Sequence, residues 1–144
     1  MNVSDVMTRD VQVATPEQSI REAALLMARI DAGTVPVGKD NRLVGMLTDR
    51  DITVRAVAKG LGPDTPVRDV MSADVKYCYD DQSVEEVARN MADIQVRRLP
   101  VVNRDKRLVG ILSLGDLAVR SDCDTDDALR GVSTPGGEHS QSER

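Results

Sequence analysis

Two stretches of the chain carry apolar residues at the three- and four-residue spacing of an amphipathic helix. Their apolar positions are Ile20, Ala23, Ala24 and Met27 in the first stretch and Val84, Val87, Ala88 and Met91 in the second. A Ser precedes each stretch and a Glu follows that Ser three residues later, which is typical of a capping box. The two pairs are Ser19 with Glu22 and Ser83 with Glu86. The pattern predicts two helices that each present one face to a core, and Gly33 is expected to end the first.

Short apolar runs separated by polar residues predict strands around these helices. Two hairpins are expected, pairing residues 35–38 with 43–47 and residues 99–102 with 108–112. A short strand is expected before each helix, at 11–14 and 74–78, and a turn of helix at 4–7. A last helix should begin near Thr48 or Asp49 and stop at Gly60, and its counterpart near Ser113 or Leu114. Each half therefore has the order βαββα, an α+β (α/β) arrangement with a small three-stranded sheet.

The two halves are copies of one unit. At a shift of 64 residues, 3–7 (VSDVM) aligns with 67–71 (VRDVM), and one inserted residue later 42–48 (RLVGMLT) aligns with 107–113 (RLVGILS). An internal repeat of this kind decides the architecture. One unit buries little apolar surface alone, so we expect the copies to pack sheet against sheet around a pseudo-two-fold axis.

The repeat also gives the domain boundaries. Residues 1–60 form the first domain and 67–121 the second, joined by a linker at 61–66 whose two Pro and one Gly cannot continue a helix. Residues 122–144 are polar and acidic without apolar periodicity, and we expect them to be disordered.

Composition narrows the classes of function. The net charge is -5, most of it from the acidic tail, and the chain has two Tyr and no Phe or Trp. Neither a basic surface nor aromatic stacking platforms are expected, so nucleic acid is not a predicted partner. No stretch approaches the length of an apolar membrane span, and Cys78 and Cys123 lack CxxC spacing. We therefore expect a cytoplasmic protein without a membrane or metal partner.

One motif recurs at the end of the second hairpin strand in each copy: Gly, two apolar residues, Thr or Ser, two variable residues and Asp. It reads GMLTDRD at 45–51 and GILSLGD at 110–116. At a helix start, the hydroxyl and the carboxylate would share one face beside unpaired backbone N–H groups. Hydroxyl and N–H groups suit a phosphate, and a carboxylate can accept both hydroxyls of a ribose. In one copy alone the same residues are also an ordinary helix cap.

With its Val35-Pro36-Val37 and Leu99-Pro100-Val101 strands and this repeated motif, the stretch from 3 to 120 resembles a tandem pair of CBS domains. The resemblance implies a non-catalytic module that binds AMP, ADP, ATP, S-adenosylmethionine or NAD in clefts between the paired domains. It implies that Asp51 and Asp116 hold ribose hydroxyls and that Thr48 and Ser113 contact ribose or phosphate. The adenine would lie near Val11 and Val35 in one site and near Val75 and Leu99 in the other.

Three arginines, Arg50, Arg97 and Arg98, are candidate phosphate ligands because a guanidinium offers a planar fork to phosphate oxygens. Solvated surface charge is the alternative interpretation for each. Gly115 occupies the position that matches Arg50, so the two sites should differ, with the Thr48 and Asp51 site the tighter.

Catalysis is not expected. His139 is the only histidine and lies in the tail, so no Ser/His or Cys/His couple can form in the folded part. The alternative to a nucleotide sensor is a structural scaffold with unoccupied clefts. In either case the helices carry more apolar residues than one face can bury, which predicts a homodimer that signals to a downstream protein. Those residues are Leu25, Leu26, Ile30, Ile52, Val54, Ala56, Val57 and Ala58.

Overall fold

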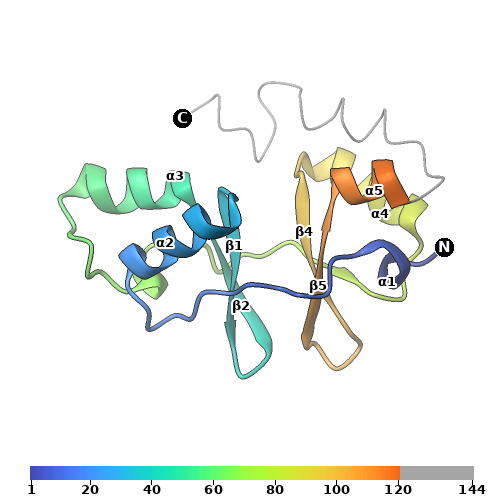
Figure 1. Ribbon diagram of the computed structural model, residues 1–144, viewed down its shortest axis with the longest axis horizontal. Coiled ribbons are helices and arrows are strands. Elements are labelled where there is room, and N and C mark those ends of the chain that lie inside the picture. Colours follow the sequence, from blue (N-terminus) through green and yellow to red (C-terminus); the bar gives the residue numbers. More distant parts are fainter. Residues whose placement is uncertain (121–144) are drawn as a thin grey trace. The chain divides into compact units, whose positions relative to one another are not determined.

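The computed structural model describes residues 1–120, in two compact units (Figure 1). One unit contains Met1–Val11, Lys76–Asp105 and residues 109–120; the other contains Gln12–Val75 and Lys106–Leu108. The predicted acidic tail lies outside the described residues. No helix in the described part of the chain is long and apolar enough to cross a membrane.

The unit built on the first repeat contains the helix α2 (Ile20–Ile30) and an antiparallel hairpin of β1 (Thr34–Lys39) and β2 (Arg42–Thr48). Asp40 and Asn41 form its turn with φ of 54° and 64°, the left-handed pair that a tight hairpin requires. The expected strand at 11–14 is reduced to one bridge between Ala14 and Val37, so this sheet has two strands rather than three. The core of this unit consists of Ala14, Ile20, Ala23, Leu26, Met27, Val35, Val37, Leu47, Ala56, Val67 and Val70.

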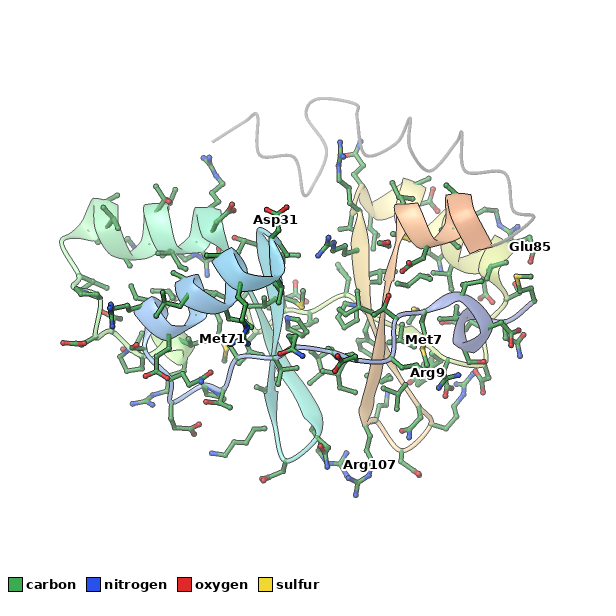
Figure 2. The ribbon with its side chains drawn as sticks, in the orientation of Figure 1. Met7, Arg9, Asp31, Met71, Glu85 and Arg107 are labelled. Carbon is green, nitrogen blue, oxygen red and sulfur yellow. The ribbon has the colours of Figure 1, made fainter. Side chains whose placement is uncertain are left out.

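The N-cap predicted for α2 is confirmed, because the Ser19 side chain accepts a hydrogen bond from the Glu22 N–H at 3.1 Å. The Glu22 carboxylate contacts the Ser19 hydroxyl at 3.4 Å. The predicted end of this helix is wrong. Asp31, not Gly33, adopts the left-handed conformation that stops it, with φ 53° and ψ 52° (Figure 2). An Asp tolerates this conformation better than most side chains, and Gln95 ends the matching helix in the same way.

The unit built on the second repeat has a three-stranded sheet in the order β3 (Cys78–Tyr79), β4 (Arg98–Val102) and β5 (Leu108–Ser113). Strand β3 runs parallel to β4, and it covers only the last residue of the expected 74–78 strand and the residue after it. The helix α4 (Val84–Ile94) begins at its Ser83 cap, and α5 (Leu114–Arg120) follows β5 directly. Its interior consists of Val3, Val6, Met7, Cys78, Val84, Val87, Ala88, Met91, Leu99, Val101, Leu112 and Leu117.

The start of each repeat packs in the unit that is built on the other repeat. The helix α1 (Val3–Val6) opens the first repeat, but Thr8 and Ile111 of β5 exchange two backbone hydrogen bonds of 2.9 Å. Likewise, the 3-10 turn η3 (Val67–Asp69) opens the second repeat, but Ser72 and Met46 of β2 exchange two bonds of 2.9 Å. The compact units and the sequence repeats therefore differ by an exchange of their first segments.

These contacts explain the glycine that begins the repeated motif. A Cβ on Gly45 would lie 2.6 Å from Met71 Sδ and 2.9 Å from the Ser72 carbonyl oxygen. A Cβ on Gly110 would lie 2.5 Å from Met7 Sδ (both Met are labelled in Figure 2). The motif glycine is thus required by the segment that packs beside the strand, because no larger residue fits there.

Candidate functional site

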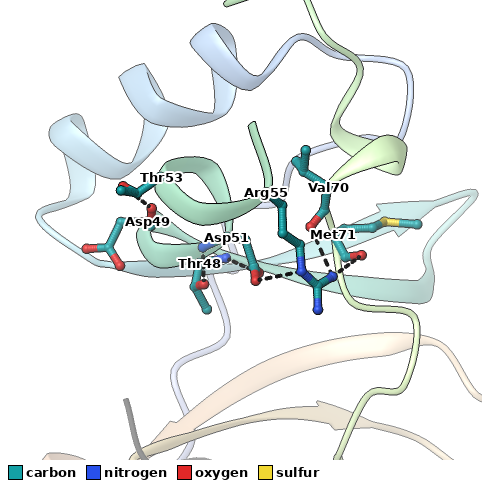
Figure 3. Close-up of polar contacts among 7 residues, drawn as sticks. All are labelled: Thr48, Asp49, Asp51, Thr53, Arg55, Val70 and Met71. Atoms are coloured by element: carbon teal, nitrogen blue, oxygen red, sulfur yellow. Dashed lines mark hydrogen bonds and ion pairs between the residues drawn. The ribbon is translucent and has the colours of Figure 1, made fainter. Parts of the chain in front are cut away.

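The first copy of the motif lies where β2 ends and the helix α3 (Asp49–Asp51) begins (Figure 3). Thr48 is the N-cap: its Oγ1 accepts a hydrogen bond from the Asp51 N–H at 2.9 Å. In return, the Thr48 N–H donates to Asp51 Oδ2 at 3.0 Å. The chain continues through a π-helix, η1 (Ile52–Ala56), and a 3-10 turn, η2 (Val57–Lys59), to left-handed Gly60, which confirms the predicted stop.

The second copy has the same geometry at the junction of β5 and α5. The Asp116 N–H donates to Ser113 Oγ at 3.1 Å, and the Ser113 N–H donates to Asp116 Oδ2 at 3.1 Å. In both copies, the hydroxyl and the carboxylate are therefore brought together as expected. They also form the reciprocal helix cap that was the alternative interpretation.

The backbone N–H groups at these turns are less available than the sequence suggested. Besides the capping bonds, the Asp49 N–H donates to the Gly33 carbonyl at 2.9 Å, and the Leu114 N–H donates to the Arg97 carbonyl at 3.0 Å. The donors that a phosphate would need are thus partly engaged with the protein itself. An anion at either turn would depend on side chains for much of its binding.

The two carboxylates differ in their surroundings. Asp51 is the one buried charged residue in the described part of the chain, 7% exposed, whereas Asp116 is half-buried. Asp51 Oδ1 lies 3.8 Å from Arg55 Nε, and Arg55 also donates to the carbonyls of Val70 and Met71 at 3.4 and 3.3 Å (Figure 3). Arg55 was not among the site residues expected from the sequence, although its spacing of four residues from Asp51 is that of an ion pair within a helix.

The candidate phosphate ligands are distributed between the two turns. Arg50 is half-buried within α3, next to Asp51. Arg97 and Arg98 are exposed where β4 begins, and the Arg97 carbonyl bond to Leu114 places them beside the second turn. Each turn therefore has arginines of its own, from different elements.

The four apolar residues expected to contact adenine are divided between the two units. Val35 and Leu99 are buried, each in the interior of its own unit. Val11 and Val75 are half-buried. Val11 belongs to the unit that contains Leu99, and Val75 belongs to the unit that contains Val35.

Other reactive groups in the described part of the chain do not form a site. Burial of Cys78 raises the pKa of its thiol to about 12, with a smaller contribution from Asp80. The thiol therefore stays protonated at neutral pH and is a poor nucleophile. Among residues 1–120, no group of three or more His, Cys, Asp or Glu side chains is placed to hold a metal ion. The lone His139 lies outside the described residues.

Known proteins are similar to this chain in sequence. The CBS domain-containing protein YhcV of Bacillus subtilis is 46% identical over 118 residues, which are 82% of this chain and 84% of that protein. Hypoxic response protein 1 of Mycobacterium tuberculosis is 39% identical over 116 residues, 79% of this chain and 80% of that protein. Both relatives match across most of their own length.

Two solved structures carry adenosine ligands. CBSX2 in complex with AMP has a TM-score of 0.71 and 30% identity, covering 81% of this chain and 93% of that one. The CBS domain pair of protein MJ0100, in complex with 5-methylthioadenosine and S-adenosyl-L-methionine, has a TM-score of 0.70 and 27% identity, covering 82% and 93%.

The repeat itself matches a known family. The model of the CBS domain matches residues 3–57 and again residues 67–121, one match for each copy of the repeated unit. This confirms the resemblance indicated by the repeated motif, and the α+β fold agrees with that of the solved CBS pairs. The chain therefore belongs to the CBS-domain family, as a tandem pair.

Proposed function

We propose that the chain is a non-catalytic regulatory module that binds an adenosine-containing nucleotide at its two capped turns. AMP, ADP or ATP are the preferred ligands, with NAD and S-adenosylmethionine as further candidates. The observation that carries the proposal is the recurrence of a hydroxyl and a carboxylate, locked together, at equivalent places in both repeats. The AMP complex of CBSX2 and the adenosine-ligand complex of MJ0100 support the same class of ligand.

The chemistry of each turn suits a ribose. A carboxylate offers about four lone-pair positions, and Asp51 and Asp116 each use one on the backbone N–H of the cap. The remaining positions can accept the 2′ and 3′ hydroxyls. Because Thr48 and Ser113 accept a hydrogen bond at their hydroxyl oxygen, the hydroxyl proton serves as a donor to the ligand.

The remaining candidates complete the proposed sites. Arg50, Arg97 and Arg98 would pair with phosphate oxygens, to which a guanidinium binds in a fork. Val11, Val35, Val75 and Leu99 are the residues proposed to contact adenine. The output would be a change of conformation or of dimer contacts that a downstream protein detects. The cytoplasmic location expected from the sequence is part of the same proposal.

A structural scaffold without ligand is the second candidate function. The observation that favours it is the cap itself, since Thr48 with Asp51 and Ser113 with Asp116 stabilise their helices whether or not a ligand binds. The two candidates share a fold, so ligand binding must separate them.

Thermal unfolding with AMP, ADP, ATP, NAD and S-adenosylmethionine tests the proposal. A ligand that binds the folded state alone stabilises it by about 2.7 kcal/mol at about 100 times its Kd. Asp51→Asn combined with Asp116→Asn should abolish this gain, because an Asn oxygen can keep the cap while the charge is lost. Asp93→Asn, at an exposed position of α4, is the control and should behave as wild type. The scaffold is favoured instead if no nucleotide raises the melting temperature of the wild type.

The homodimer belongs to the same proposal. Leu26 and Ala56, which were expected at an association surface, are buried in their own unit, whereas Leu25, Val54 and Val57 are 56%, 42% and 66% exposed. Exposed apolar side chains on helices are typical of an association surface. Light scattering at micromolar concentration should give about twice the chain mass of 15.7 kDa, and Leu25→Glu with Val57→Glu should restore the single-chain mass.

A further inference from the structure

The two turns have the same backbone contacts at equivalent positions but different charges. Gly33 and Arg97 are 64 residues apart, and their carbonyls accept the N–H groups of Asp49 and Leu114, which are 65 apart. The bonds are 2.9 and 3.0 Å long. The repeats can therefore be compared residue by residue at this place.

In the first repeat, the Asp49 carboxylate lies beside Gly33. In the second repeat, the residue equivalent to Gly33 is Arg97. A Cβ on Gly33 would lie 2.9 Å from Asp49 Oδ2 and 3.4 Å from Asp49 Oδ1. At the equivalent position the second repeat has Arg97, and Leu114 replaces Asp49. The same location thus changes from negative in the first repeat to positive in the second.

The neighbouring residues strengthen this difference. Over the positions compared, the first repeat has three acids, Asp31, Asp49 and Asp51, against Arg50 and Arg55. Of those two cations, Arg55 already contacts Asp51 and two backbone carbonyls. Asp31 is exposed at the end of α2 (Figure 2).

The matching residues of the second turn reverse the balance. Asp116 is the one acid among the matching described positions, against Arg97, Arg98 and Arg120, and Gln95 stands where the first repeat has Asp31. The formal charge summed over these positions is -1 at the first turn and +2 at the second. The backbone donors are engaged in the same way at both turns, so side-chain charge is the feature that distinguishes the two turns for an anion.

We propose that the turn of Ser113 and Asp116 takes the phosphate-bearing adenosine nucleotide, whereas the turn of Thr48 and Asp51 prefers an adenosine whose 5′ substituent is uncharged or cationic. Arg97 and Asp49 are the residues that determine this specificity. The proposal rests on the proposed function. For phosphorylated ligands, this order of affinity is the reverse of the one expected from Arg50 alone, which made the turn of Thr48 and Asp51 the tighter site.

Calorimetry with AMP and with adenosine tests the proposal, because the two ligands differ only in the phosphate. Each turn is measured separately in a chain whose other carboxylate is neutralised, by Asp51→Asn or by Asp116→Asn. The ratio of adenosine Kd to AMP Kd should be at least about tenfold higher at the second turn, which corresponds to a modest Coulomb difference between partly solvated charges. The AMP affinity of the second turn should also fall as salt is added.

Exchanging the two residues should exchange the preference. Arg97→Gly, which installs the first repeat's residue, should weaken AMP about tenfold at the second turn while adenosine binding changes less than about twofold. Arg97→Gln repeats the test without adding a flexible glycine to the start of β4. Asp49→Leu, which installs the second repeat's residue, should strengthen AMP several-fold at the first turn and leave adenosine unchanged. Unfolding curves confirm that each variant is folded.

The outcomes are distinguishable. The proposed specificity is overturned if the ratio of adenosine Kd to AMP Kd is equal at both turns. It is also overturned if neither Arg97→Gln nor Asp49→Leu changes that ratio. In both cases, adenosine binding would still support the proposed function. If neither adenosine nor AMP binds the wild type at millimolar concentration, the proposed function fails, and this inference fails with it.

Discussion

Gly45→Ala should destabilise the protein, because the added methyl group meets atoms that cannot all move away. The new Cβ would lie 2.6 Å from Met71 Sδ and 2.9 Å from the Ser72 carbonyl oxygen. The sulfur is the far part of a flexible side chain and can shift. The carbonyl oxygen accepts the Met46 N–H, and the Ser72 N–H returns a bond to Met46, both at 2.9 Å. Moving this oxygen would therefore strain the bridge that holds the segment to β2.

The size of the effect follows from three contributions. Overpacking a filled site costs about 1–3 kcal/mol. Weakening a backbone hydrogen bond adds about 0.5–1.5 kcal/mol. The lower entropy of the unfolded Ala chain offsets about 0.4–1 kcal/mol. The net loss is about 2 kcal/mol, which for a chain of this length corresponds to a fall of about 8 °C in the melting temperature.

Thermal and urea unfolding measure this loss against a matched glycine. A Cβ on Gly62 meets no heavy atom within 4 Å, so Gly62→Ala should leave stability unchanged or slightly higher. Gly110→Ala should reproduce the loss, since its Cβ would lie 3.0 Å from the Thr8 carbonyl. In a double-mutant cycle, Met71→Ala should relieve only part of the penalty at Gly45. If Gly45→Ala unfolds at the same temperature as Gly62→Ala, the methyl group does not meet the Ser72 carbonyl as described.

Three further predictions concern a cap, an ion pair and a thiol. Asp51→Ala should lower the free energy of unfolding in urea by about 1 kcal/mol. Asp51→Asn should lower it clearly less, because Asn keeps an acceptor for the Thr48 N–H. Equal losses in the two variants would contradict the role of this acceptor. The Arg104 hydrogen bond lowers the pKa of exposed Asp81, so the ion pair stabilises the fold above the ordinary Asp pKa, and this stabilisation is lost as pH falls through the lowered value. Acid titration of unfolding should therefore show a smaller pH dependence below about pH 4 for Arg104→Gln than for wild type, and identical profiles would count against the pair. With Cys123 replaced by Ser, Cys78 should resist alkylation in the native protein at pH about 8 and react in urea, because burial raises its pKa to about 12; rapid native labelling would show that the thiol is accessible.

The sequence alone determined the elements whose signals are local. The helices α2 and α4 begin at Ser19 and Ser83 because a cap and its apolar stripe lie within one short segment. The hairpins follow from two apolar runs and a polar turn between them, and the motif at the end of β2 and β5 follows from its recurrence. Duplication was equally visible, and with it the family, since the same unit occurs twice in one chain.

The tertiary structure decided which copies of similar segments pack together. Residues 3–7 and 67–71 have nearly the same sequence, so local pattern cannot say which sheet each one joins. The structure places each beside the strand of the other repeat, and only then do the glycines at 45 and 110 acquire their steric reason.

Side-chain environments likewise depended on contacts between residues distant in sequence. Asp49 is close to Gly33 only because β1 and β2 pair, and Arg55 reaches the Val70 carbonyl only because the segment after η3 packs beside it. Charge at the two turns is therefore a property of the fold. Periodicity and caps report forces within a few residues, whereas the pairing of strands and exchanged segments depends on the burial of apolar surface across the whole unit.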